Sequence, residues 1–266
     1  MDETLRDHPV LDFGAGTGWI TEFVARMGWP VTAFDIHGDL EGCLNARIDA
    51  DSRIDRNLIS FGHGDGHAMP FADASFGHIL VFDTLHHMRD FEKVFAEFAR
   101  ILIPGGRAIF VEPGAKHSTS LQTIEFLRLK ILDAEWIERD IVLEQIDDIA
   151  SRCGFSEMTV IPSEHTISLH QLPLHAWRSF RAGHKTLRSA MADDLARINY
   201  DQRVVFYCNF DGQKRAQEYK TRFPAAINAQ HSLRYPMGVT WHMKHFTRTM
   251  LPDWAVNLIR RMRPRA

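Results

Sequence analysis

The chain has 266 residues, of which 45% are hydrophobic and 24% are charged, and its formal net charge at pH 7 is -3. This composition predicts a globular protein with one substantial core, and the nearly balanced charge argues against nucleic acid as a partner. Three cysteines without C-x-x-C spacing and the lack of a long apolar run argue against a disulfide framework, a structural zinc site and a membrane span. We therefore expect a cytoplasmic protein without a metal ion.

The first part of the chain alternates between strand and helix patterns. An apolar run at 10–13 leads into the turn "GAGTG" at 14–18, and apolar residues then recur at helical spacing up to Gly28. Strand patterns follow at 31–36, 78–82 and 107–112, and a helical stripe runs from Phe91 to Leu102. This alternation predicts an α/β fold with a doubly wound, Rossmann-like sheet whose ligands lie at the carboxyl ends of the strands.

The second part divides into a continuation of the core and two additions. We expect a helix near 141–149, strands at 158–162 and 203–210, a core domain at 1–162, a helical insertion at 163–202 and a C-terminal extension at 211–266. In the insertion, Trp177, Arg178 and Arg181 offer an aromatic wall and guanidinium groups for an acceptor. A helix that only covers the sheet edge explains the same residues equally well.

The glycine turn and two carboxylates predict a nucleoside pocket. Glycines let the backbone approach a ligand closely, and Asp35, at the end of the second strand, can accept hydrogen bonds from two ribose hydroxyls. Asp65 stands where a carboxylate can accept the exocyclic amine of adenine. The dinucleotide fingerprint G-x-G-x-x-G has Trp19 in place of its third glycine, which argues against NAD.

Five segments resemble the ordered motifs of class I S-adenosylmethionine-dependent methyltransferases: "VLDFGAGTGW", "AFDIHG", "GDGHAMPFADASF", "VFDTLHHM" and "RILIPGGRAIFVEP", across residues 10 to 113. The resemblance implies a seven-stranded sheet with an antiparallel last strand and S-adenosyl-L-methionine as cofactor. It implies these contacts: Gly14, Ala15 and Gly16 with the methionine part, Asp12 with its amine, Asp35 and Ile36 with the ribose, Asp65 and Gly66 with the adenine, and Asp83 with the methionine end.

Two features depart from the family pattern. The family usually has "FD" where this chain has Phe76-Gly77, and it usually has one or two helices before the first strand, where only about nine residues stand here. We therefore expect the cover over the cofactor to come from the insertion and the tail, or the chain to be a fragment of a longer one.

Methyl transfer is an in-line displacement, so the protein mainly has to position donor and acceptor. A hydroxyl or amine acceptor also needs a base, and His86, His87 and His117 follow the fourth and fifth strands; we favour His86, with His117 as a second candidate. "EPGAKHSTS" at 112–120 resembles a loop of bacterial members associated with surface-glycan gene sets. The predicted activity is methyl transfer to oxygen or nitrogen of a small molecule or a surface-glycan component.

Several alternatives stay open at this stage. The chain can instead be a non-catalytic partner protein that binds S-adenosylmethionine, or a nicotinamide-dependent oxidoreductase. The paired histidines can serve packing alone, and His63 and His67 beside Asp65 lack the further acids or cysteines of a metal site. The end "LPDWAVNLIRRMRPRA" fits either an anionic membrane surface or a docked helix with a solvated end, and we expect the docked helix.

Overall fold

The computed structural model describes residues 1–129, 136–161, 172–181, 203–216 and 227–228. The first part alternates as predicted, with these elements: β1 (Val10–Phe13), α1 (Trp19–Arg26), β2 (Val31–Asp35), α2 (Leu40–Ala50), β3 (Ile59–His63), β4 (Phe76–Phe82), α3 (Phe91–Ile101) and β5 (Leu102–Pro113). Three short 3-10 turns accompany them: η1 (Glu3–Leu5), η2 (Arg56–Leu58) and η3 (Leu85–His87). The later elements are α4 (Leu121–Leu129), β6 (Ile137–Glu138), α5 (Leu143–Arg152), β7 (Thr159–Val160), β8 (Leu172–Pro173), α6 (Leu174–Arg181), β9 (Arg203–Asn209) and β10 (Ile227–Asn228).

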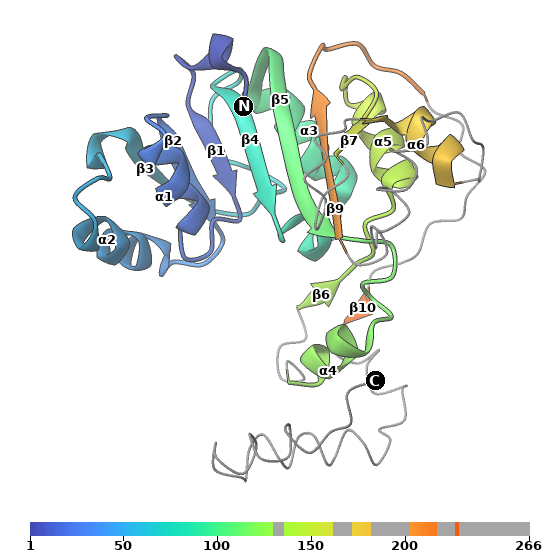
Figure 1. Ribbon diagram of the computed structural model, residues 1–266, viewed down its shortest axis with the longest axis horizontal. Helices are drawn as coiled ribbons and strands as arrows, with labels where there is room; N and C mark the ends of the chain where they lie inside the picture. Colours follow the sequence, from blue (N-terminus) through green and yellow to red (C-terminus); the bar gives the residue numbers. More distant parts are fainter. Residues whose placement is uncertain (130–135, 162–171, 182–202, 217–226, 229–266) are drawn as a thin grey trace.

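The main sheet has the strand order β3-β2-β1-β4-β5-β9-β7-β8 (Figure 1). The five strands from β3 to β5 are parallel to their neighbours, whereas β9 is antiparallel to both β5 and β7. This confirms the predicted Rossmann-like sheet, including the antiparallel last strand inserted between β5 and β7. The short edge strand β8, which pairs with β7, is an addition that the sequence did not indicate.

Two hydrophobic clusters cover the two faces of the sheet, because successive residues of a strand point to opposite faces. Helices α1 and α2 pack with Val10 and Val31 on one face, and α3 and α5 pack with Leu11 and Ile79 on the other. Helix α3 begins where the side chain of Asp90 accepts a hydrogen bond from the backbone N–H of Lys93, which caps the helix.

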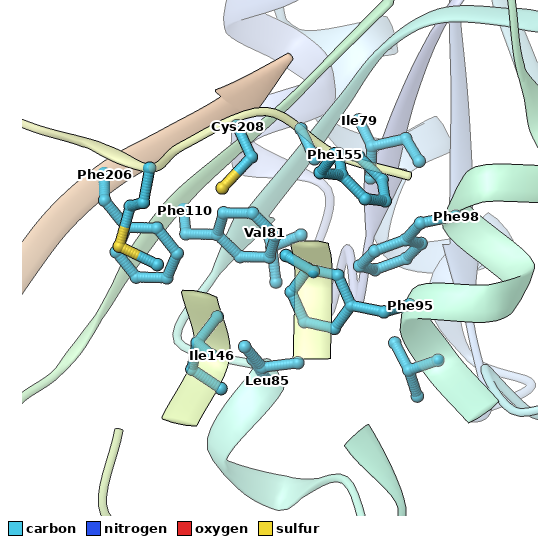
Figure 2. Packing of buried hydrophobic residues seen from close by; sticks show 14 of the residues in the cluster. Ile79, Val81, Leu85, Phe95, Phe98, Phe110, Ile146, Phe155, Phe206 and Cys208 are labelled. Atoms are coloured by element: carbon cyan, nitrogen blue, oxygen red, sulfur yellow. The ribbon is translucent and has the colours of Figure 1, made fainter. Parts of the chain in front are cut away.

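Stacked phenylalanines join the second cluster across strands and helix. Figure 2 shows Phe95 and Phe98 of α3 against Phe110 of β5, and Phe206 of β9 beside Phe110. The rings of Phe110 and Phe206 stack with centroids 4.6 Å apart, which ties the antiparallel strand to the parallel part of the sheet. Each such side chain stabilises the fold by about 1.5–3 kcal/mol through burial.

A small unit of α4, β6 and β10 lies beyond the carboxyl edge of the parallel strands (Figure 1). Strands β6 and β10 pair antiparallel, so Ile227 of the predicted C-terminal extension lies opposite Glu138. The sequence assigned the cover of this edge to the insertion and the tail. The described part of the insertion, β8 and α6, instead lies against β7 at one edge of the sheet, whereas β10 of the tail does pair with β6 beyond the carboxyl edge.

None of the helices among the residues that the structure describes is long and apolar enough to cross a membrane. The arginine-rich end of the chain, from Leu251 onward, lies outside the described residues.

Candidate functional site

The glycine turn after β1 holds the backbone in a conformation that other residues rarely adopt. Gly14 has φ +74°, and a Cβ added there would lie 2.2 Å from the side chain of Thr84. Gly16 has φ +54°, and a Cβ added there would meet no atom within 4 Å. Gly14 is therefore required by close packing, while Gly16 leaves open space for a ligand.

A cavity of about 660 Å³ opens beside this turn. Seven of the nine predicted cofactor residues line it: Gly14, Gly16, Asp35, Ile36, Asp65, Gly66 and Asp83. The rings of Phe13 and Phe34 add apolar wall, and the volume lies within the usual range for small-molecule sites.

Two carboxylates stand at the ends of neighbouring strands in this cavity. Asp35 accepts hydrogen bonds from the backbone N–H of Gly16 and of His37, both at 2.8 Å, so its carboxylate is fixed and keeps further lone pairs for a ligand. Asp65 accepts from the backbone N–H of His67 at 2.9 Å, and this hydrogen bond holds the pKa of Asp65 below its ordinary value. Fixed acceptors beside open space and apolar walls fit an adenosine with its ribose hydroxyls and its amine.

The other two predicted cofactor residues, Asp12 and Ala15, do not line this cavity. Asp12 is only 2% exposed, beneath the turn, where its carboxylate accepts a hydrogen bond from the hydroxyl of Thr21 at 2.5 Å. Burial raises the pKa of Asp12 to about 6, against an ordinary value of 3.8. Ala15 packs in the cluster under α1 and α2. Neither residue is among those that line the cavity, and the expected support of the ligand's amine by Asp12 stays a prediction.

A second cavity, of about 870 Å³, lies next to the first. Asp83, His87 and Trp136 line both cavities and therefore stand where the two meet. Asp83 has φ +49°, a left-handed conformation rare for a residue other than glycine, and both its carboxylate oxygens accept hydrogen bonds from Arg203 of β9 at 2.9 Å. This bidentate ion pair fixes the carboxylate at the junction.

Glu112, at the end of β5, anchors one wall of the second cavity from inside the protein. Its carboxylate is fully buried and accepts hydrogen bonds from the backbone N–H of Thr84 at 2.9 Å and of Leu85 at 2.8 Å. Its other oxygen lies 2.8 Å from Nδ1 of His86. Burial disfavours the imidazolium of His86, but the hydrogen bond and the charge of Glu112 outweigh burial and raise its pKa.

Glu138 of β6 joins the two predicted catalytic histidines. Its Oε2 lies 2.7 Å from Nε2 of His117 and 3.6 Å from Nε2 of His86, and its Oε1 accepts a hydrogen bond from the indole N–H of Trp136 at 2.8 Å. The sequence singled out His86 and His117 but missed Glu112 and Glu138. Glu112 lies in "VEP" at 111–113, the end of one of the five motifs, so the sequence offered a signal for it. Glu138 lies in "WIERD" at 136–140, which belongs to no motif and has no periodic pattern.

His87 lies beside this group but has a different environment. Its Nδ1 lies 3.0 Å from the carbonyl oxygen of Ile137, which places the proton on Nδ1 and leaves a lone pair on Nε2. Burial and the charge of His86 lower the pKa of His87. Because both ring nitrogens of His86 face carboxylates, His87 is better placed than His86 to accept a proton at the junction.

Comparison with known proteins agrees with this geometry. A family model described as "Methyltransferase domain" matches residues 11–110. The segment is a class I S-adenosylmethionine-dependent methyltransferase domain. The resemblance noted from the five motifs is thereby confirmed.

The methyltransferase domain aligns with curated relatives over about a hundred residues. It is 35% identical to methyltransferase GfsG of Streptomyces halstedii, over 38% of this chain and 36% of the relative. It is 37% identical to demethylmenaquinone methyltransferase of Tropheryma whipplei (strain Twist), over 39% of this chain and 41% of the relative. The chain thus spans about two fifths of the length of the curated relatives it matches.

The fold of the methyltransferase domain also occurs in solved structures. Phosphoethanolamine N-methyltransferase 2 of Haemonchus contortus, solved in complex with S-adenosyl-L-methionine, superposes with a TM-score of 0.52 at 20% identity, covering 77% of this chain and 49% of that chain. This likeness supports the fold assignment.

The predicted acceptor residues of the insertion lie apart from the methyltransferase site. Trp177 is 4% exposed and packs in the core cluster with Leu174 and Met158, so the interpretation of Trp177 as a cavity wall was wrong. The Nε of Arg178 lies 3.5 Å from a carboxylate oxygen of Glu144 on α5, and Arg178 is not among the residues of either cavity. The side chain of Arg181 lies outside the described residues. The apolar residues of a helix have the same spacing in the sequence whether they pack on a core or line a pocket, so the pattern of α6 did not distinguish the two.

Proposed function

We propose that this chain is an S-adenosylmethionine-dependent methyltransferase that methylates an oxygen or nitrogen atom of an acceptor held in the second cavity. The observation that carries the proposal is the junction of the two cavities at Asp83, His87 and Trp136. A cofactor in the first cavity then presents its methyl group at the opening of the second.

The acceptor is a small molecule or a component of a glycan that carries a hydroxyl or amine. The second cavity combines the aromatic rings of Phe126 and Trp136 with the polar groups of Lys116, His117 and Arg203. Such a lining suits an acceptor with one flat or apolar face and several polar substituents. Phenols have this character, as do sugars with an apolar ring face.

The chain's own residues position the reactants and accept a proton. Asp35 and Asp65 hold the nucleoside, and the ion pair of Asp83 with Arg203 fixes the border between donor and acceptor. Nε2 of His87, whose ring is oriented by Ile137, accepts the proton of the acceptor hydroxyl or amine. The bound cofactor supplies an electrophilic methyl group, and alignment in a near-attack geometry supplies most of the rate.

The test starts with calorimetric titration of the purified chain with S-adenosylmethionine and S-adenosylhomocysteine, with NADH as control. We expect micromolar binding of the first two and no binding of NADH. The chain is then incubated with methyl-labelled cofactor and a panel of phenols, quinols, small amines and glycans, and label should appear in one acceptor class. Cofactor binding without transfer to any class would favour a non-catalytic binding protein instead.

The role of His87 is tested with a matched pair of variants. His87→Gln should lower the turnover number much more than the cofactor affinity, because His87 lines both cavities but its Nε2 is assigned to the proton of the acceptor. His175→Gln is the control, since this exposed histidine on α6 pairs with Glu157 away from both cavities. Equal turnover in the two variants would contradict the assignment.

A further inference from the structure

We infer that His86, His117 and Glu138 form a binding site for one divalent transition-metal ion in the wall of the acceptor cavity. The three side chains come from η3, from the loop after β5 and from β6, and each offers one ligand atom. These ligand atoms all lie within 4.8 Å of one another, and all three residues line the second cavity. The sequence predicted no metal because it considered only the three cysteines and the histidines beside Asp65.

The distances among the ligand atoms are close to those of a metal centre. A tetrahedral zinc ion with bonds of about 2.0–2.1 Å separates its ligand atoms by about 3.3 Å. Nε2 of His86 lies 3.6 Å from Oε2 of Glu138, and Nε2 of His117 lies 2.7 Å from the same oxygen. The second distance has to lengthen by about 0.6 Å, as the hydrogen bond that joins the two groups gives way to an ion. The ligand nitrogens of His86 and His117 lie within 4.8 Å of each other, so they have to approach by at most about 1.5 Å.

Each ligand is also oriented through the atom that would not touch the ion. Nδ1 of His86 lies 2.8 Å from the buried carboxylate of Glu112, which directs Nε2 toward the site. Oε1 of Glu138 accepts a hydrogen bond from Trp136 at 2.8 Å, which leaves Oε2 for the ion. Nδ1 of His117 lies 3.3 Å from the hydroxyl of Thr123. A carboxylate behind a ligating histidine is a common feature of metal sites, where it fixes the ring and raises its basicity.

The charge of the group is compatible with a dication. Glu112 and Glu138 are 0% and 2% exposed, and buried carboxylates are stabilised by positive charge close by. One divalent ion supplies such charge with neutral imidazoles. Two histidines and one carboxylate are the donor set of zinc and similar transition metals, whereas Mg²⁺ and Ca²⁺ prefer oxygen ligands.

Three protein ligands leave a fourth position, and that position faces the acceptor cavity. An ion there polarises an acceptor hydroxyl and eases its loss of a proton. This role of the ion rests on the proposed function, but the existence of the site does not.

The experiment uses the full chain after treatment with a chelator and dialysis. Calorimetric titration with Zn²⁺ should give one equivalent bound with a dissociation constant at or below the micromolar range. A parallel titration with Co²⁺ should produce the visible absorption of a four- or five-coordinate ion. S-adenosylmethionine binding, measured on the same samples, reports that the first cavity is folded.

Variants assign the ion to these residues. His117→Gln and Glu138→Gln should each weaken Zn²⁺ binding at least about 100-fold, and Glu112→Gln, which does not touch the ion, should weaken it about 10- to 100-fold. His175→Gln should leave the affinity unchanged. The inference is overturned if the chain binds S-adenosylmethionine but takes up no Zn²⁺, or if the His175 variant loses Zn²⁺ as the ligand variants do.

The same data separate this inference from the proposed function. A chain that binds one Zn²⁺ through these residues but transfers no methyl group would support the site and contradict the activity. Methyl transfer by a metal-free chain at the full rate would support the activity and contradict the role of the ion.

Discussion

The buried carboxyl of Asp12 should make the stability of this protein depend on pH in a direction opposite to that of an ordinary salt-bridged acid. Burial raises its pKa from 3.8 to about 6, although the hydrogen bond from Thr21 opposes the shift. The unfolded chain therefore releases this proton before the folded chain does, and stability is lost as pH rises through this range. The difference of roughly 2 pKa units, at about 1.36 kcal/mol each, amounts to about 3 kcal/mol.

The variant Asp12→Asn isolates this effect, because asparagine still accepts the hydrogen bond from Thr21 and never ionises. The free energy of unfolding of the variant, relative to the unchanged chain, should rise by about 3 kcal/mol between pH 4 and pH 7. Urea unfolding followed by tryptophan fluorescence at each pH measures it. Thr21→Val should act in the opposite direction, since it removes the hydrogen bond that favours the carboxylate. A variant-to-parent difference that stays constant with pH would refute the reasoning.

Three further predictions follow from the same geometry. Asp35→Ala should weaken S-adenosylmethionine binding by about 1–3 kcal/mol in calorimetry, because a fixed acceptor is lost; unchanged affinity would contradict its place in the pocket. Gly66→Ala should destabilise the fold by about 1–3 kcal/mol in urea unfolding, since its Cβ would lie 2.4 Å from the ring of Phe13, whereas Gly16→Ala should lower cofactor affinity in addition to the smaller backbone cost of its φ of +54°. Burial lowers the pKa of His78 to about 4, so stability should fall as pH drops from 6.5 to 4, and His78→Gln should flatten that part of a urea-unfolding pH series.

The cofactor half of the site could be predicted because it is encoded locally. Asp35 ends β2 and Asp83 follows β4, two strands that the hydrophobic pattern located, whereas Asp65 follows β3, which that pattern did not predict and which the motif "GDGHAMPF" marked instead. Parallel strands bring their carboxyl ends to one edge, and the residues at those ends meet there without any long-range information. Of the two predicted residues that do not line the cavity, Asp12 lies within β1 rather than at its end, and Ala15 packs in the cluster under α1 and α2.

The acceptor half could not be predicted because its elements leave no periodic signal. β6 and β10 have two residues each and pair over a long sequence distance, as Glu138 does with Ile227. A two-residue strand is too short to show alternation. The expected cover at Trp177 failed for a related reason: an amphipathic helix has the same pattern whether its apolar face meets a ligand or a core.

This division also explains how far the relatives inform the chemistry. The family model ends at residue 110, and most of the residues that line the acceptor cavity, among them His117, Glu138 and Arg203, come after it, whereas Asp83, His86 and His87 lie within the matched segment. The matched segment, residues 11–110, therefore contains the residues that line the cofactor cavity up to Arg89. The residues of the acceptor cavity beyond position 110 are not aligned with the family model. The quinones and amines in the names of the relatives therefore say little about the acceptor of this chain. The acceptor is better sought from the cavity itself, starting with compounds that place a hydroxyl between His87 and the group of His86, His117 and Glu138.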